Sequence, residues 1–186
     1  MARKIGTQSN DILLGTDLND ALEGRGGHDR LSGFGGHDDL EGGSGRDTLF
    51  GGTGNDDLEG DSGNDQLFGG AGRDDLEGGS GHDRLHGGSG SDWLEGGFGD
   101  DLLTGGRGAD VFEFGDDGET GHDVITDFTQ GRDRLELDDF TRAEVQAVID
   151  GARQSGNHVV LTLSEGSTVT LRDTQVSQLD MGDFLL

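Results

Sequence analysis

An aspartate recurs every nine residues along most of the chain, and carboxylates in such a regular series could bind metal ions. An apolar residue stands two positions after each aspartate. Residues 6–113 therefore form twelve nine-residue units without an insertion, and residues 51–59 read Gly-Gly-x-Gly-x-Asp-x-Leu-x. The repeated aspartates are Asp11, Asp20, Asp29, Asp38, Asp47, Asp56, Asp65, Asp74, Asp83, Asp92, Asp101 and Asp110.

The turn before each aspartate supplies further oxygen atoms. A tight glycine-rich turn directs successive carbonyl oxygens to one side, and the aspartate adds a carboxylate. Two stacked turns would surround one gap with carboxylates and carbonyls, which suits the roughly six to eight oxygen ligands that calcium takes. Magnesium requires a stricter octahedron, and zinc or copper would require His or Cys clusters that the repeats do not form. This chemistry favours Ca²⁺, with six to nine gaps filled.

The composition makes folding without cations unfavourable. Asp plus Glu number 39 against 13 Lys plus Arg, the formal charge is −26, and only 28% of residues are hydrophobic. Such a chain is typical of disorder. A metal site that exists only in the folded chain converts binding free energy into folding free energy. We therefore expect a chain that is disordered at low calcium and folds when calcium is bound.

The same composition excludes several classes of function. An acidic surface does not suit nucleic acid, and no apolar run is long enough to span a membrane. The chain has no Cys, and residues 1–6 contain no apolar stretch that could act as a secretory signal. No zinc-protease His motif and no nucleophile setting is present, so we expect no catalytic residue and no enzyme activity.

The elements that would position the aspartates follow from the unit. Its first six residues predict a turn, and its last three predict a short strand with the apolar residue facing inward. Glu occupies the ninth position only in alternate units, eighteen residues apart. One coil therefore has eighteen residues with two turns and two strands, and alternate units build two parallel sheets. The acidic ladder of Asp39, Glu41, Asp57, Glu59, Asp75 and Glu77 lies on one sheet, and Phe50 and Phe68 stack on the other.

These units resemble the RTX nonapeptide repeat, the hemolysin-type calcium-binding repeat. The resemblance covers residues 6–113 and implies an all-β fold: a right-handed parallel β-roll with eighteen residues per coil and two sheets of short strands. It also implies that calcium is held by sixth-position aspartates and by turn carbonyls. On this chain the expected aspartates are Asp29, Asp38, Asp47, Asp56, Asp65, Asp74, Asp83, Asp92, Asp101 and Asp110. The expected glycines are Gly43, Gly45, Gly52, Gly54, Gly63, Gly70, Gly72, Gly79, Gly81, Gly88, Gly90, Gly97, Gly99, Gly106 and Gly108.

The first units depart from this pattern at their second position. Thr7 and Thr16 stand there in the first two units, and Arg25 and Phe34 in the next two. We therefore place the first calcium ligand at Asp29. The sequence does not decide whether calcium binds at Asp11, Asp20, Asp123, Asp127 or Asp133.

The tail after the repeats predicts a small cap of strands and a helix. Helical spacing covers residues 141–153 with Thr141 as the cap, and two strands at 158–163 and 168–172 predict a hairpin. Gly121 to Leu137 resembles the segment that follows the repeats in serralysin-type proteases. The final four residues, 183–186, resemble the ending of type I secretion substrates. We thus divide the chain into a leader (1–5), a β-roll (6–113) and a cap with an export signal (114–186).

The leading prediction is a non-enzymatic calcium-binding β-roll, extracellular after type I secretion. One alternative is that the chain is the calcium-binding and export module of a larger secreted enzyme, such as a protease, lipase or alginate epimerase. Another is a secreted binding or adhesion module that uses its acidic face or the face of Phe50 and Phe68. That apolar pair could instead receive the predicted helix of the tail.

Overall fold

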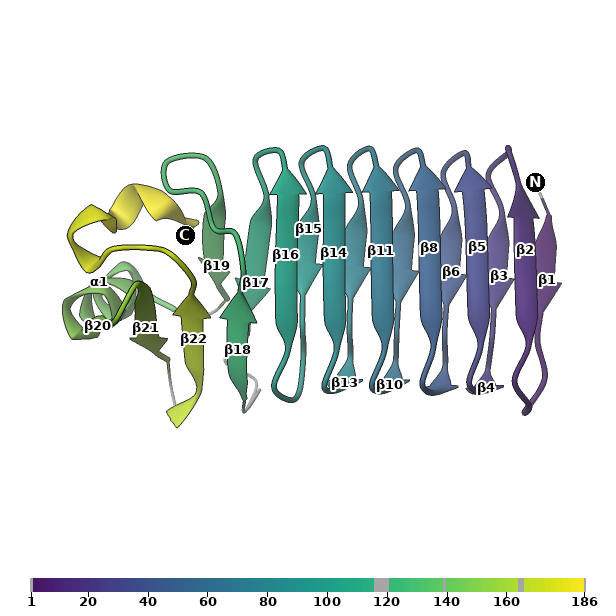
Figure 1. Cartoon of the computed structure of the whole chain (residues 1–186), viewed down its shortest axis with the longest axis horizontal. Helices are drawn as coiled ribbons and strands as arrows, with labels where there is room; N and C mark the ends of the chain where they lie inside the picture. Colours follow the sequence, from purple (N-terminus) through teal and green to yellow (C-terminus); the bar gives the residue numbers. More distant parts are fainter. Residues whose placement is uncertain (1, 116–120, 139, 164–165, 186) are drawn as a thin grey trace.

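The apolar residue of each unit sets the plan of the fold. In the computed structural model, which describes residues 2–115, 121–138, 140–163 and 166–185, the chain winds as a long solenoid with two large sheets facing each other (Figure 1). The repeated Leu side chains lie between these sheets, and Leu31, Leu40 and Leu67 are fully buried. A single continuous core therefore runs along the rod.

Alternate units build separate sheets, as the period of eighteen predicted. The first has nine strands: β1 (Arg3–Ile5), β3 (Ala21–Glu23), β6 (Asp39–Glu41), β9 (Asp57–Glu59), β12 (Asp75–Glu77), β15 (Trp93–Glu95), β17 (Val111–Phe114), β19 (Arg134–Leu137) and β23 (Phe184–Leu185). The second has ten: β2 (Ile12–Thr16), β5 (Arg30–Gly35), β8 (Thr48–Thr53), β11 (Gln66–Ala71), β14 (Arg84–Ser89), β16 (Leu102–Arg107), β18 (His122–Ile125), β22 (Thr168–Leu171), β21 (His158–Thr162) and β20 (Arg153–Ser155).

The register confirms the coil length. Leu40 of β6 pairs with Leu58 of β9, and Leu67 of β11 pairs with Leu85 of β14, eighteen residues on in each case. All pairs within the repeats are parallel, since each strand meets the equivalent strand of the next coil. The predicted parallel β-roll is confirmed.

A third sheet was not predicted. Four two-residue strands at the turns pair in parallel: β4 (Gly26–Gly27), β7 (Ser44–Gly45), β10 (Ser62–Gly63) and β13 (Ser80–Gly81). The prediction of two sheets was incomplete because it treated the glycine-rich segments as turns alone. Identical turns stacked at the spacing of strands also form ladder hydrogen bonds, such as Ser62 N–H to the Gly43 carbonyl oxygen at 3.0 Å.

One repeated Leu departs from its predicted burial. The residues from Leu22 to Phe112 at this position are at most 2% exposed, but Leu13 is only partly buried. Leu13 lies in the coil nearest the N-terminus, where no earlier coil covers it. Ile12 and Leu14 beside it are 71% and 45% exposed.

The tail closes the other end of the roll. Strands β18 and β19 extend the two sheets by one more pair, and β20, β21 and β22 form an antiparallel extension. The helix α1 (Arg142–Gly151) follows its N-cap Thr141, whose side chain accepts from Glu144 N–H in a capping box. Two short 3-10 helices, η2 (Val176–Gln178) and η3 (Met181–Asp183), precede β23.

The cap differs from its prediction in two details, which are the end of the helix and the place where it packs. The helix ends at Gly151, since residues 153–155 form the strand β20. The hairpin pairing of β21 and β22 is confirmed, although residues 164 and 165 of its connection, and Leu186 of the export motif, lie outside the described residues. The helix α1 contacts β21 and η3 at the C-terminal end of the rod (Figure 1). It therefore does not cover Phe50 and Phe68, and that expectation was wrong.

The outward faces of the two sheets carry different side chains. Phe50 and Phe68 stack with ring centroids 5.0 Å apart, as predicted, and the Arg30 guanidinium lies 4.2 Å from the Phe50 centroid. On the other sheet Asp39 pairs with Asp57, and Glu41 with Glu59, so the predicted acidic ladder is present. Within the described residues, no helix is long and apolar enough to cross a bilayer.

Candidate metal centre

The repeated aspartates form two ladders, one along each row of turns. One carboxylate oxygen, Oδ1, accepts a hydrogen bond from the backbone N–H of the aspartate eighteen residues earlier. Asp38 N–H donates to Asp56 Oδ1 at 2.9 Å, and Asp47 N–H donates to Asp65 Oδ1 at 2.7 Å. The ladder therefore holds each carboxylate in one orientation between two coils.

The other carboxylate oxygen, Oδ2, is left without a partner in ten aspartates. Among the described residues these oxygens are buried and accept no hydrogen bond. A buried carboxylate oxygen without a donor is unfavourable, because it loses its water and gains nothing in return. The ten residues are Asp29, Asp38, Asp47, Asp56, Asp65, Asp74, Asp83, Asp92, Asp101 and Asp110. They are the same ten aspartates that the sequence proposed as metal ligands.

The burial of these carboxylates changes their acidity. Burial raises the pKa of Asp65 and of Asp74 to about 7. Burial raises the pKa of Asp101 to about 8, and the neighbouring carboxylates of Asp123 and Asp83 add to that effect. These groups would be partly protonated near neutral pH in the polypeptide alone. A bound cation would stabilise the ionised form.

Glycines keep open the space around each unpartnered oxygen. A Cβ atom on Gly51, the first residue of its unit, would lie 2.5 Å from Asp56 Oδ2 and 2.7 Å from the Gly69 carbonyl oxygen. A Cβ on Gly69 would likewise lie 2.6 Å from Asp74 Oδ2 and 2.8 Å from the Gly87 carbonyl oxygen. At these first-position glycines, Oδ2 and a backbone carbonyl oxygen therefore flank a space that a side chain would occupy.

The predicted site glycines share one backbone conformation. All fifteen of them, at the second and fourth positions of their units, have φ between 82° and 156°. Three inner units have a residue other than Gly at the second position, and they show whether the positive φ is kept there. Arg25, Phe34 and Asp61 keep φ values of 77°, 74° and 67°. This region costs roughly 1–2 kcal/mol for a residue with a Cβ. The turn geometry is thus retained even at a cost, which is typical of functional sites.

The donor set suits a hard cation with many oxygen ligands. Over the part of the chain that the structure describes, no three His, Cys, Asp or Glu side chains gather as a metal-binding group. A cation at Oδ2 would therefore take most of its ligands from turn carbonyls, with the carboxylate supplying charge. Calcium accepts such carbonyl-rich, irregular coordination, whereas zinc and copper favour nitrogen and sulfur. The residues present therefore fit Ca²⁺.

The aspartates that the sequence left open make different contacts. Asp127 accepts the N–H groups of Gly105 and Gly106 at 3.0 and 2.8 Å. Asp123 Oδ1 accepts from Asp101 N–H at 2.9 Å, which continues one ladder beyond the repeats. A hydrogen bond from the Ala2 N–H, with a smaller contribution from Thr16, lowers the pKa of Asp20, in contrast to the inner aspartates.

Side chains at the fifth position of the nine-residue units form further hydrogen bonds between coils, which the sequence analysis did not predict. His28 Nδ1 accepts from Arg46 N–H at 2.8 Å, and His37 Nδ1 accepts from Asn55 N–H at 2.7 Å. The frequent Asn, His, Ser and Asp residues at this position could have predicted these bonds, since each side chain can accept a hydrogen bond from a backbone N–H of the next coil.

No curated protein sequence matches the chain. The solved structures that match it include an extracellular lipase and a subunit of an epimerase. The extracellular lipase LipA from Serratia marcescens is 20% identical, with a TM-score of 0.39 over 99% of this chain and 39% of the lipase. The AlgE6R3 subunit of the Azotobacter vinelandii mannuronan C5-epimerase is 20% identical, with a TM-score of 0.38 over 97% of this chain and 80% of the subunit. The chain thus spans well under half of the lipase.

The repeats themselves match a family model. Four copies of the RTX calcium-binding nonapeptide repeat match residues 5–40, 14–49, 50–85 and 86–118, which together cover more than half of the chain. The chain belongs to the RTX calcium-binding nonapeptide repeat family.

Proposed function

We propose that the chain binds several Ca²⁺ ions between the stacked turns of its β-roll and folds when they bind. The observation that carries this proposal is the set of ten buried aspartate Oδ2 atoms without a hydrogen-bond donor. Each would bind one side of a calcium ion, with turn carbonyls as the remaining protein ligands. Six to nine ions would neutralise a large part of the formal charge of −26.

Folding and binding are coupled in this proposal because the ligands come from different coils. In an unfolded chain the aspartates of one ladder are eighteen residues apart and form no site. Binding free energy is then available only to the folded chain, which it stabilises by mass action. Repeat arrays also fold as neighbours stack, so one filled gap favours the next.

Export in the unfolded state explains the benefit of this coupling. Extracellular calcium modules work at roughly 10⁻⁴ to 10⁻³ M calcium, far above cytosolic levels. The chain would remain extended inside the cell, leave through a type I system by its C-terminal segment, and fold outside. In this proposal the role is structural and non-enzymatic, and residues 114–186 act as cap and export signal behind the roll of residues 6–113.

An alternative within the same chemistry is a calcium-binding module of a larger secreted enzyme. RTX repeats are a structural calcium-binding module in either case. Measuring export and activity of the natural full-length product would distinguish the two. The calcium chemistry proposed for the turns is the same under both.

The test of the proposed function is a calcium titration from a chelated sample. Circular dichroism should show little strand in excess EGTA and a cooperative gain of strand as free calcium rises. Trp93 is the single Trp and is half-buried next to Glu113, so its fluorescence should report the same transition. Magnesium is the matched control and should act far more weakly. Equal strand content in EGTA and in calcium would refute the proposal.

A further inference from the structure

The first two units use their aspartates differently from the inner ten. Their second positions hold Thr7 and Thr16, which do not adopt the positive φ of Arg25, Phe34 and the glycines at that position. Asp11 and Asp20 are also absent from the set of aspartates whose Oδ2 is buried without a partner. The two differences occur in the same units, which suggests one cause.

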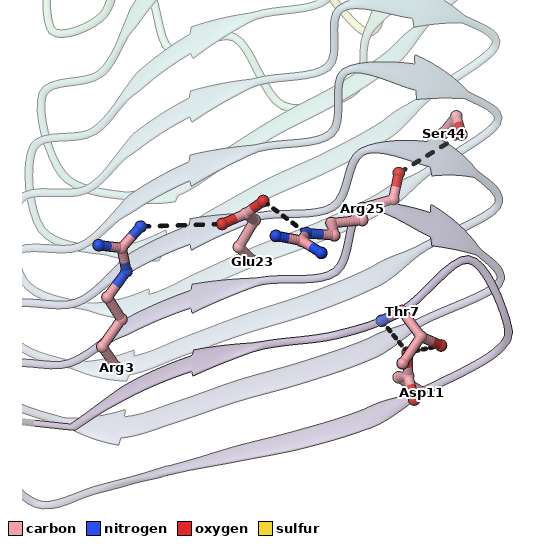
Figure 2. Close-up of polar contacts among 6 residues, drawn as sticks. All are labelled: Arg3, Thr7, Asp11, Glu23, Arg25 and Ser44. Carbon is pink, nitrogen blue, oxygen red and sulfur yellow. Dashed lines mark hydrogen bonds and ion pairs between the residues drawn. The ribbon is translucent and has the colours of Figure 1, made fainter.

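Thr7 supplies the donors that the inner aspartates lack. Its backbone N–H donates to Asp11 Oδ2 at 2.6 Å, and its hydroxyl donates to the same oxygen at 2.8 Å (Figure 2). In the next unit the Thr16 hydroxyl donates to Asp20 Oδ2 at 2.7 Å. Asp20 is 2% exposed, as deeply buried as the inner aspartates. Burial alone therefore does not leave an Oδ2 unpartnered.

A related arrangement, in which the backbone N–H replaces the hydroxyl, recurs at the other end of one ladder; the Thr129 hydroxyl donates to the Asp127 carbonyl oxygen at 3.3 Å. Asp133 follows the repeats and accepts Asp110 N–H on its Oδ1 at 3.1 Å. Its Oδ2 accepts the backbone N–H of Thr129 at 2.7 Å. The threonine again precedes the aspartate by four residues, as in the first two units. Threonine donors thus stand at both ends of the array, outside the ten inner units.

We propose that a threonine four residues before the aspartate takes the place of calcium, so that Asp11, Asp20 and Asp133 end the ladders without metal. This inference rests on the proposed calcium binding of the inner turns. A donor aimed at Oδ2 satisfies the carboxylate within the polypeptide, whereas an inner Oδ2 has no protein donor and attracts a cation. The residue at the second position therefore determines whether a turn binds calcium.

This arrangement gives the roll ends that do not require the metal. A terminal turn has a neighbouring coil on one side only, so fewer elements hold its carboxylate in place. A threonine satisfies that carboxylate from within the turn itself. Atypical terminal units are also a general feature of repeat arrays, whose end repeats have a neighbour on one side only.

Counting bound calcium by equilibrium dialysis tests the inference on the full chain. The samples are the unchanged chain, Asp20→Asn, and Asp56→Asn as the matched inner control. We expect Asp20→Asn to bind as many ions as the unchanged chain and Asp56→Asn to lose at least one. Loss of an ion in both variants would overturn this inference but leave the proposed function intact. An unchanged chain that binds no calcium would overturn both.

A second pair of variants leaves every carboxylate in place. Thr16→Gly removes both the hydroxyl and the barrier to positive φ, and Thr16→Ser keeps a hydroxyl as the control. We expect Thr16→Gly to gain one calcium ion and Thr16→Ser to gain none. An unchanged count in Thr16→Gly, with circular dichroism confirming a folded roll in calcium, would contradict the inference.

Discussion

The inner turns of the roll and the turns at its ends use the same aspartate with opposite consequences. Asp56 holds its ladder hydrogen bond through Oδ1 and leaves Oδ2 buried without a donor. Asp20 belongs to the same ladder, since its N–H donates to Asp38 Oδ1, but it receives the Thr16 hydroxyl on Oδ2. In the inner turns the polypeptide supplies no hydrogen-bond donor to Oδ2, whereas in the end turns a threonine does. We infer that the interior depends on calcium and the ends do not.

The largest expected effect is the pH dependence of folding stability, which should come mainly from the inner turns. Burial raises the folded-state pKa of Asp65 and Asp74 to about 7 and of Asp101 to about 8, against an ordinary value of 3.8. Because these pKa values are raised, protonation stabilises the calcium-free fold fully below about pH 4, and this stabilisation is lost progressively as the pH rises from about 4 to about 8. Each aspartate contributes a limiting slope of about 1.4 kcal/mol per pH unit.

The measurement is circular dichroism between pH 5 and pH 8, with thermal unfolding added in excess calcium. In EGTA, where the chain has little strand near pH 8, we expect strand content to rise as the pH falls. In excess calcium we expect the opposite trend, because protons compete with the ion for the same oxygens. Parallel trends in the two buffers would show that the inner carboxylates do not bind calcium.

A single methyl group in an inner turn should have the next largest effect. Gly54→Ala places a Cβ 1.4 Å from the Gly36 carbonyl oxygen at a φ of 139°. We expect a loss of roughly 3 kcal/mol or more in calcium, from overpacking and backbone strain together. Gly131→Ala is the control in the cap, where φ is 71° and no atom lies within 4 Å of the added Cβ. It should cost only about 1 kcal/mol by urea denaturation, and equal losses would refute the close stacking of turns.

The core should show a similar contrast between interior and end. Leu67 is fully buried between coils, whereas Leu13 is only partly buried in the first coil. Leu67→Ala should cost about 2–5 kcal/mol of unfolding free energy in calcium. Leu13→Ala should cost clearly less, since solvent already reaches its side chain. A larger loss for Leu13→Ala would indicate that another segment covers the N-terminal coil.

The cap should give the smallest effect and no dependence on calcium. Thr141 and Glu144 form the capping box of α1, with Thr141 N–H donating to Glu144 Oε2 at 2.8 Å. Thr141→Ala should cost about 1 kcal/mol of unfolding free energy. The calcium midpoint followed by Trp93 fluorescence should stay unchanged. A shifted midpoint would mean that the helix contributes to the metal sites.

The repeat made the roll predictable, because strict spacing fixes both the coil length and the inward residue. The alternation of Glu at the ninth position predicted which strands pair, and Leu40 and Leu58 do so. The third sheet was missed because glycine-rich turns were assigned no strand character. The strand β23 was missed because two residues such as Phe184 and Leu185 have no readable periodicity. Its pairing with β19 depends on the whole cap.

The candidate site was predictable to the level of residue type and spacing. The choice of Asp29 as the first ligand followed from the weak pattern around Thr7 and Thr16, and it coincides with the first unpartnered Oδ2. What the sequence could not show is that these threonines donate to the aspartates. That contact depends on the sign of φ at the second position, and Arg25 and Phe34 have the positive value although neither is Gly.

Anomalous diffraction from crystals grown in calcium tests the central claim most directly. We predict calcium peaks about 2.3–2.6 Å from Oδ2 of inner aspartates such as Asp56 and Asp74, and none beside Oδ2 of Asp11 or Asp20. A folded roll with no anomalous peak along the inner turns would contradict the account.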